Sequence, residues 1–131
     1  MGVKKYISEG QGLPNWDNPI SHAVVVNNMC FVSGQLSLDC DGKYIEGSLL
    51  EEARQAFLNF FAALKNGGFN PDDIVTMDMA MLDISKLPEI NQLYIELFPS
   101  YKRPARTIYQ VDALPFGGKI KISGIAVQNV D

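Results

Sequence analysis

The chain has 131 residues, of which 47% are hydrophobic and 20% charged, a composition typical of a soluble globular protein. We expect one domain over residues 1–131. The net charge of −4 and the pI near 4.9 argue against nonspecific nucleic-acid binding, which needs a basic surface. Because the sequence has neither a membrane-spanning apolar run nor the apolar core of a signal peptide, we expect a cytoplasmic protein without a membrane partner.

The cysteines and the single histidine limit the chemistry that the chain can offer. Cys30 and Cys40 form no metal-binding or redox motif, so we expect reduced thiols. With His22 as the only histidine, neither a histidine-based zinc site nor a Ser-His-Asp triad is supported. We therefore favour a structural role for His22 over a catalytic one.

The N-terminal segment predicts a short strand followed by a long loop. Lys4–Ser8 fits the strand, and residues 9–18 are rich in glycine, proline and asparagine. The only tryptophan, Trp16, lies in this loop. We expect its indole to anchor the loop on the body of the domain rather than to line a pocket.

The next segment predicts a hairpin. Ser21–Val26 and Met29–Ser33 are apolar and β-branched and flank Asn27-Asn28, which predicts a type I′ turn because asparagine tolerates positive φ. Gly34 then allows close approach of the backbone to a ligand or a strand, or else marks a bulge, and both alternatives stay open. A small strand is predicted at Lys43–Ile45, after an Asp-Gly turn.

Leu49–Asn66 predicts an amphipathic helix. Ser48 is a suitable N-cap, and Glu51 completes a capping box. Gly67-Gly68 predicts a left-handed stop. The apolar residues recur with a period of 3.6 at Ala53, Phe57, Phe60, Phe61 and Leu64.

Ile74–Leu82 predicts a strand that is half buried against helices, because its residue types alternate. One face holds Val75, Met77, Met79 and Met81, and the other holds Thr76, Asp78 and Ala80. A second helix is predicted to follow, with Pro88 in its first turn. Its apolar positions are Leu87, Ile90, Leu93, Tyr94, Leu97 and Phe98. Asn91 lies near its start, and its residue type alone gives no reason to select it.

The last third predicts two strands, Arg106–Leu114 and Lys119–Val127, joined by a Pro-Phe-Gly-Gly turn. Arg106 stands at the entrance of the first, where a guanidinium can hold a carboxylate or phosphate. A structural ion pair is an equally open alternative. Acid–base chemistry would need a carboxylate nearby, and no local pattern brings Asp78 or Asp112 there.

Together these elements predict the α+β class, as a two-layer α/β sandwich with two helices on one face of a mixed sheet. The final strand alternates as well. The predicted outward face of that strand carries Lys119, Lys121, Ser123, Ile125 and Val127.

Several motifs, in combination, resemble one family along nearly the whole chain. They are Val32-Ser33-Gly34-Gln35, the helix from Gln55 to Gly67-Gly68-Phe69, Asn91-Gln92-Leu93-Tyr94, Arg103-Pro104-Ala105-Arg106-Thr107, Leu114-Pro115 and Ile122–Val127. The chain is similar to the RidA (YjgF-type) family of reactive-intermediate imine/enamine deaminases. Members of this family were once described as endoribonucleases or translation-initiation inhibitors.

The resemblance implies a chorismate-mutase-like fold, a homotrimer with ligand clefts between subunits, and neither a metal nor an organic cofactor. It implies a small carboxylate ligand, a 2-imino or 2-oxo acid, clamped by two hydrogen bonds from Arg106. Water would attack the C=N carbon and release ammonia and a 2-oxo acid. The other substrate-binding positions it implies are Ser33, Gly34, Asn91, Ile108 and Ile20.

The chain departs from the best-known members at three of its site positions. They carry a glutamate where this chain has Ser123, a tyrosine at Ile20 and often a cysteine at Ile108. The glutamate positions the water, and a serine is a far weaker base. The leading hypothesis is an imine deaminase with Arg106 and Ser123 as catalytic residues. The alternatives are a non-enzymatic protein that binds 2-oxo or amino acids and, third, an endoribonuclease, which the acidic composition disfavours.

Overall fold

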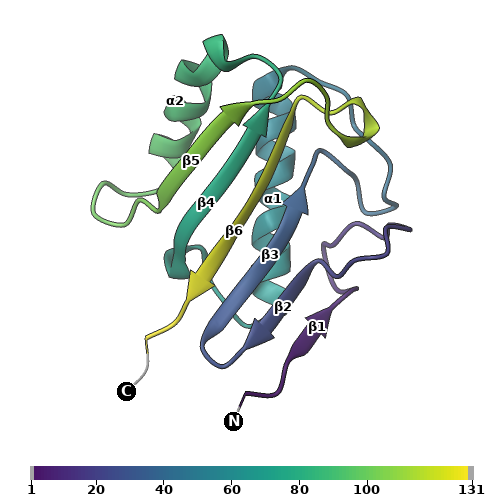
Figure 1. Cartoon of the computed structure of the whole chain (residues 1–131), viewed down its shortest axis with the longest axis vertical. Helices are drawn as coiled ribbons and strands as arrows, with labels where there is room; N and C mark the ends of the chain where they lie inside the picture. The colour runs from purple at the N-terminus through teal and green to yellow at the C-terminus, as the bar shows by residue number, and fades with distance from the viewer. Residues whose placement is uncertain (1, 130–131) are drawn as a thin grey trace.

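A computed structural model describes residues 2–129 of the chain. Within them, six strands form one mixed sheet in the order β1-β2-β3-β6-β4-β5 (Figure 1). Neighbouring strands are antiparallel except β4 and β5, which are parallel. The strands are β1 (Lys5–Ile7), β2 (Ala23–Val26), β3 (Met29–Gln35), β4 (Ile74–Met81), β5 (Ala105–Gln110) and β6 (Ile120–Val127).

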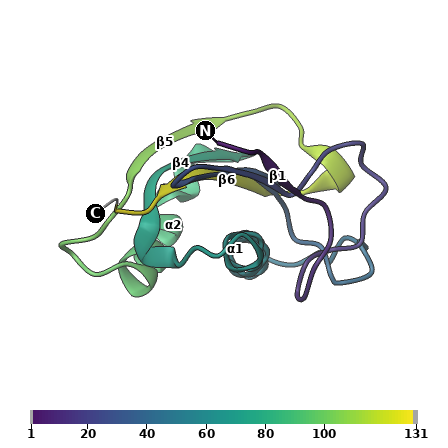
Figure 2. The same ribbon diagram turned by 90° about the horizontal axis from the view of Figure 1, so that it is seen from below.

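Two α-helices, α1 (Leu49–Asn66) and α2 (Leu87–Leu97), cover the same face of the sheet (Figure 2). This arrangement confirms the predicted two-layer α+β class. Within residues 2–129 the other face carries no α-helix, and we call it the open face. Short 3-10 turns stand at Pro71–Asp73, Ile84–Lys86 and Pro115–Gly117. No helix among residues 2–129 is both long enough and apolar enough to cross a bilayer.

Helix α1 begins and ends where its sequence predicts. The Glu51 amide donates to Ser48 Oγ at 3.1 Å, and the Ser48 amide donates to a Glu51 carboxylate oxygen at 2.9 Å, which is a complete capping box. Gly68 has a φ of +86°, the left-handed conformation that stops the helix. The predicted apolar stripe faces the sheet, and its buried members are Ala53, Phe57, Phe60 and Leu64.

The hydrophobic core lies between this stripe, α2 and the helix-facing side of the sheet. Met77, Met79 and Met81 of β4 are fully buried there, as their alternation predicts. The prediction for Val75 is wrong, because a register shift between Ile74 and Thr76 turns Val75 outward and leaves it 46% exposed.

Two local predictions in the first half need correction. The β2–β3 hairpin forms, but of its two turn residues only Asn27 has a positive φ, so the turn is not type I′. The strand predicted at Lys43–Ile45 is reduced to one bridge between Leu38 and Tyr44. There the Asp39 carboxylate accepts hydrogen bonds from two amides of the turn, which uses donors that a longer ladder would need.

The two strands of the last third are not neighbours. β4 lies between β5 and β6, so they form no hairpin across the Pro-Phe-Gly-Gly turn. The prediction failed because β5 pairs parallel with β4 after the α2 crossover, which leaves the other edge of β4 free for β6. β5 also ends at Gln110 rather than Leu114.

Candidate functional site

Arg106 lies on the edge strand β5 with its guanidinium over an aromatic ring. The guanidinium carbon is 4.9 Å from the centre of the Tyr94 ring of α2. Within residues 2–129, no carboxylate lies within 4.0 Å of Arg106, so the structural ion pair that the sequence left open is not found there. The partly buried guanidinium can therefore accept an external anion.

Tyr94 is a neutral and fixed platform for this arginine. Burial raises the pKa of Tyr94 to about 12, although the positive charge of Arg106 acts in the opposite direction. The Tyr94 hydroxyl donates a hydrogen bond to the Pro104 carbonyl at 3.3 Å. This contact ties α2 to the segment that leads into β5.

Arg106 belongs to the helix-covered side of the sheet. In the parallel β4–β5 ladder it is paired with the buried Met77, and Ile108 packs against the core two residues later. Asn91 is partly buried on α2, three residues before Tyr94 and therefore on the same side of that helix. We call Arg106, Ile108 and Asn91 the edge group.

Ser33 and Gly34 form a bulge near the end of β3. The register with β6 shifts between Val32 and Gln35, so the bulge alternative is the one observed. The Ser33 hydroxyl donates to the Ser21 carbonyl at 2.6 Å, which fixes this segment to the start of β2.

His22 is hydrogen-bonded to Gln35, the residue that follows the bulge. Its Nε2–H donates to the Pro14 carbonyl at 2.8 Å, and its Nδ1 accepts from the Gln35 amide at 3.2 Å, so the ring is neutral. Burial lowers the pKa of His22, although both hydrogen bonds oppose this shift. Trp16 stacks on His22 with ring centres 3.8 Å apart, which confirms that its indole anchors the loop.

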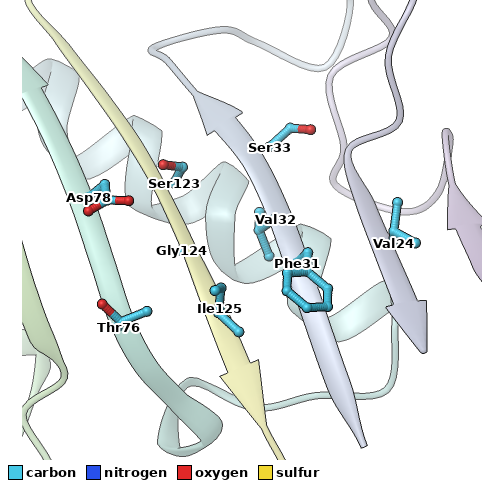
Figure 3. Close-up of a pocket in the computed structure, with 9 residues that line it drawn as sticks. All are labelled: Val24, Phe31, Val32, Ser33, Thr76, Asp78, Ser123, Gly124 and Ile125. Carbon is cyan, nitrogen blue, oxygen red and sulfur yellow. The ribbon is translucent and has the colours of Figure 1, made fainter. Parts of the chain in front are cut away.

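A shallow depression on the open face brings together polar groups from three strands (Figure 3). Asp78 of β4 and Ser123 of β6 are direct partners in the antiparallel ladder, and Figure 3 shows Ser123 between Asp78 and Ser33. Asp78 is exposed. We call this depression the open-face hollow, and its lining residues are Val24, Phe31, Val32, Ser33, Thr76, Asp78, Ser123, Gly124 and Ile125.

A second depression, the loop hollow, holds the other predicted substrate-binding positions of the open side. Gly34 and Ile20 both line it, and so do the anchoring Trp16 and the cation Lys121. Trp16 thus both anchors its loop and borders a pocket, where the sequence offered these as alternatives. The full lining is Trp16, Asn18, Pro19, Ile20, Gly34, Leu36, Pro115, Phe116 and Lys121.

A buried carboxylate holds the turn that closes the loop hollow. Glu52 of α1 accepts hydrogen bonds from the amide and the ammonium of Lys119, both at 3.0 Å, and from the Tyr44 hydroxyl at 2.5 Å. Burial alone would raise the pKa of Glu52, but these hydrogen bonds outweigh burial and lower it. Burial raises the pKa of Tyr44, and the hydrogen bond to the same carboxylate raises it further.

The predicted site residues do not meet within one chain. The edge group lies on the helix-covered side of the sheet, whereas Ser33, Gly34, Ile20 and Ser123 line the two hollows of the open side. From the sequence alone, Asp78 is a candidate carboxylate with no predicted neighbour, and Lys121 is not a candidate site residue. Alternation within the last strand already places Lys121 on the same face as Ser123, whereas Asp78 joins that face only once β4 and β6 are known to pair.

Metal-binding chemistry has no obvious location in the described part of the chain. Residues 2–129 contain no group of three or more His, Cys, Asp or Glu side chains arranged to hold a metal ion. Cys30 is buried and Cys40 exposed, and both are free thiols.

Comparisons with known proteins give the family. Residues 13–128 match the family described as endoribonuclease L-PSP. The chain is 39% identical to 2-iminobutanoate/2-iminopropanoate deaminase of Bos taurus over 127 residues, which is 96% of this chain and 91% of that protein. The crystal structure of the YjgF gene product of E. coli has a TM-score of 0.86 at 28% identity, over 95% of this chain and 99% of that chain.

A further solved structure contains a small carboxylate-bearing ligand. E. coli TdcF with bound serine matches with a TM-score of 0.85 at 29% identity, over 95% of this chain and all of that chain. These similarities confirm the resemblance seen in the motifs around Ser33 and Arg106. The chain belongs to the endoribonuclease L-PSP family, which includes the RidA and YjgF proteins.

Proposed function

We propose that this protein is an imine deaminase that hydrolyses 2-imino acids to 2-oxo acids and ammonia. The observation that carries the proposal is the Arg106 guanidinium, which is supported by the Tyr94 ring and has no carboxylate partner among the described residues. A planar fork of this kind binds a carboxylate by two parallel hydrogen bonds. The Bos taurus relative is named for the same reaction class.

The reaction needs a positioned water more than a strong base. The water oxygen forms a bond to the imine carbon while the C=N electron pair moves to nitrogen, which takes up a proton. The resulting carbinolamine then loses ammonia and leaves the 2-oxo acid. In this proposal Ser123 and Asp78 hold the water, because cross-strand partners have Cβ atoms about 5 Å apart and one water can contact both side chains.

We further propose that the site is completed between copies of the chain in a homotrimer. Arg106 and Ser123 belong to opposite faces of one sheet, so one copy alone cannot apply both groups to the same small ligand. In an intersubunit cleft, the edge group of one copy would meet the hollows of its neighbour. Ser33, Gly34 and Ile20 would then contact the substrate beside the reacting carbon.

The test is the release of 2-oxobutanoate from an imine that an amino-acid oxidase generates in place. We expect the wild type to exceed the rate in buffer, and Arg106→Ala to reduce kcat/KM by about a hundredfold. Arg106→Lys should recover little, because an ammonium cannot form the paired hydrogen bonds. The matched control is Arg54→Ala, which removes an exposed arginine paired with Glu96. A wild-type rate equal to buffer would contradict the proposal.

A second candidate function is ligand binding without turnover. It is favoured by the serine at position 123, which supplies no carboxylate of its own. In that case calorimetry would give saturable binding of 2-oxobutanoate while the imine assay stays at the buffer rate. Activity gained by Ser123→Glu would then identify the missing carboxylate as the cause.

A further inference from the structure

Lys121 of β6 lies against the bulge of β3. A Cβ atom added to Gly34 would stand 2.7 Å from Lys121 Cδ and 3.4 Å from Lys121 Cε. The lysine stem therefore occupies the space that a side chain at position 34 would need. Because the ammonium nitrogen is bonded to Cε at about 1.5 Å, it lies within about 5 Å of that Cβ position. The charged end of Lys121 is thus held beside one of the substrate-binding positions that the family resemblance implies.

This ammonium has no carboxylate partner within residues 2–129. No carboxylate oxygen lies within 4.0 Å of it, whereas Lys119 is paired with Glu52 at 3.0 Å. The partner of Lys121 in the ladder with β4 is Ala80, which has no polar side chain. Lys121 is partly buried and, among the described residues, is the only charged one that lines the loop hollow. Its ammonium, with three N–H donors and no acceptor, can therefore act on a molecule in that hollow.

The proposed hydrolysis needs a proton donor, because the imine nitrogen takes up a proton as water adds to the carbon. The Arg106 guanidinium cannot be deprotonated. The Ser33 hydroxyl already donates to a backbone carbonyl at 2.6 Å, and the neutral ring of His22 is fully buried with both nitrogens hydrogen-bonded. Asp78 accepts the proton of the water in this reaction. Lysine, by contrast, is one of the side chains that serve as general acids in enzymes, which directs attention to Lys121.

We propose that Lys121 is the general acid of the reaction and gives a proton to the nitrogen of the bound imine. The inference rests on the proposed function, which places Gly34 and Ile20 beside the reacting carbon, and Lys121 lines the same hollow as both. As the water oxygen bonds to carbon, the C=N electron pair takes a proton from the ammonium while Asp78 takes one from the water. Loss of ammonia then moves the carbinolamine hydroxyl proton to nitrogen, and exchange with solvent returns the proton of Asp78 to the lysine amine.

Steady-state hydrolysis of a 2-imino acid by variants of position 121 tests this role. Lys121→Ala should lower kcat by about a hundredfold and leave KM within about twofold, because Arg106 still holds the substrate. Lys121→Arg keeps the charge but cannot give up a proton, so it should be as slow as Lys121→Ala. The matched control is Lys65→Ala, which removes an exposed lysine from α1 on the other side of the sheet and should keep the wild-type rate.

Ethylammonium added to Lys121→Ala provides a second measurement. This cation can enter the space that the lysine stem vacates and donate the missing proton, so it should raise kcat by about fivefold or more. The rate with the same amine but without protein is subtracted. Tetramethylammonium carries the same charge and has no N–H, so it should give no rescue. Rescue by ethylammonium also demonstrates that the variant is folded.

Wild-type kcat in either Lys121→Ala or Lys121→Arg would overturn the assignment of Lys121. A slow Lys121→Ala variant that ethylammonium does not rescue, or that tetramethylammonium rescues equally, would overturn it as well. A wild-type rate equal to buffer rejects the deaminase, and the general acid with it. Wild-type turnover above buffer, with unchanged kinetics in Lys121→Ala, rejects the general acid and keeps the deaminase.

Discussion

Asp78 and Ser123 face each other as register partners across β4 and β6. Both line the open-face hollow, with Ser33 on the next strand (Figure 3). The resemblance to the RidA family implies a glutamate at the position of Ser123, and in the proposed reaction the carboxylate of Asp78 supplies comparable chemistry from the neighbouring strand. In the proposed reaction, Asp78 is therefore the carboxylate that accepts a proton from the water, although position 123 carries a serine.

Asp78→Asn should lower kcat for imine hydrolysis by about a hundredfold, because the amide cannot accept a proton from water as a carboxylate does. KM should change little, since Arg106 still holds the substrate. The control is Asp112→Asn, an exposed aspartate beyond β5. A fully active Asp78→Asn variant would rule out this role, and the double variant Asp78→Asn/Ser123→Glu should recover activity if position 123 accepts the same function.

Tyr94→Leu should raise KM for a 2-imino acid about fivefold, since it removes the ring on which the Arg106 guanidinium lies. Tyr94→Phe keeps the ring and loses only the hydrogen bond to Pro104, so it should keep KM near the wild-type value. Steady-state kinetics of the two variants, compared at equal folded fraction by circular dichroism, provide the test. Identical KM values for both variants would exclude a role of the ring in holding Arg106.

Glu52→Gln should destabilise the fold by about 2–3 kcal/mol, because Lys119 and Tyr44 lose a charged acceptor in a buried place. The folded-state pKa of Glu52 is lowered, so its contribution is fully present above the unfolded pKa of about 4.3 and is lost as the pH falls through the folded pKa. Urea unfolding at pH 7 and in acid measures the free energies of unfolding of the wild type and of the variant. The difference between these two free energies should shrink in acid. Glu96→Gln, at an exposed ion pair, should cost less than about 1 kcal/mol.

The buried neutral His22 predicts a loss of stability on mild acidification. Since burial lowers its folded pKa, its contribution is present above the unfolded pKa of about 6.5 and declines as the pH falls toward the folded value. The slope cannot exceed about 1.4 kcal/mol per pH unit for one proton. Urea unfolding between pH 7 and 5 should show the free energy of unfolding of the wild type declining within this limit. His22→Gln should reduce that decline. An equal slope in both proteins would assign the effect to other groups.

The elements that the sequence predicts well are those set by neighbours along the chain. Helix α1 follows from its 3.6-residue period and from the capping box at Ser48, and the β2–β3 hairpin follows from two apolar runs around Asn27-Asn28. Strand order is different, because it depends on contacts between distant segments. Two strands joined by a turn suggest a hairpin, and no local pattern reveals that β4 separates β5 from β6.

The same limit applies to the candidate site. Residue type and motif were enough to select Arg106, but its aromatic partner Tyr94 was predicted only as a core residue. No local pattern places Asp78, since its position beside Ser123 requires the β4–β6 register. The alternation of the last strand predicts the face of Lys121, but the close approach of its stem to Gly34 depends on the β3 bulge.

The place of β6 in the sheet has a consequence for how the protein is made. β6 is the only link between the β1-β2-β3 ladder and the β4-β5 pair among the described strands, and it comprises residues 120–127. On the ribosome, β3 and β4 therefore each keep an unpaired edge until β6, the last of these strands along the chain, has been synthesised. The sheet is therefore completed only after its other five strands have been made, and a chain truncated before β6 would leave two unpaired strand edges open to aggregation.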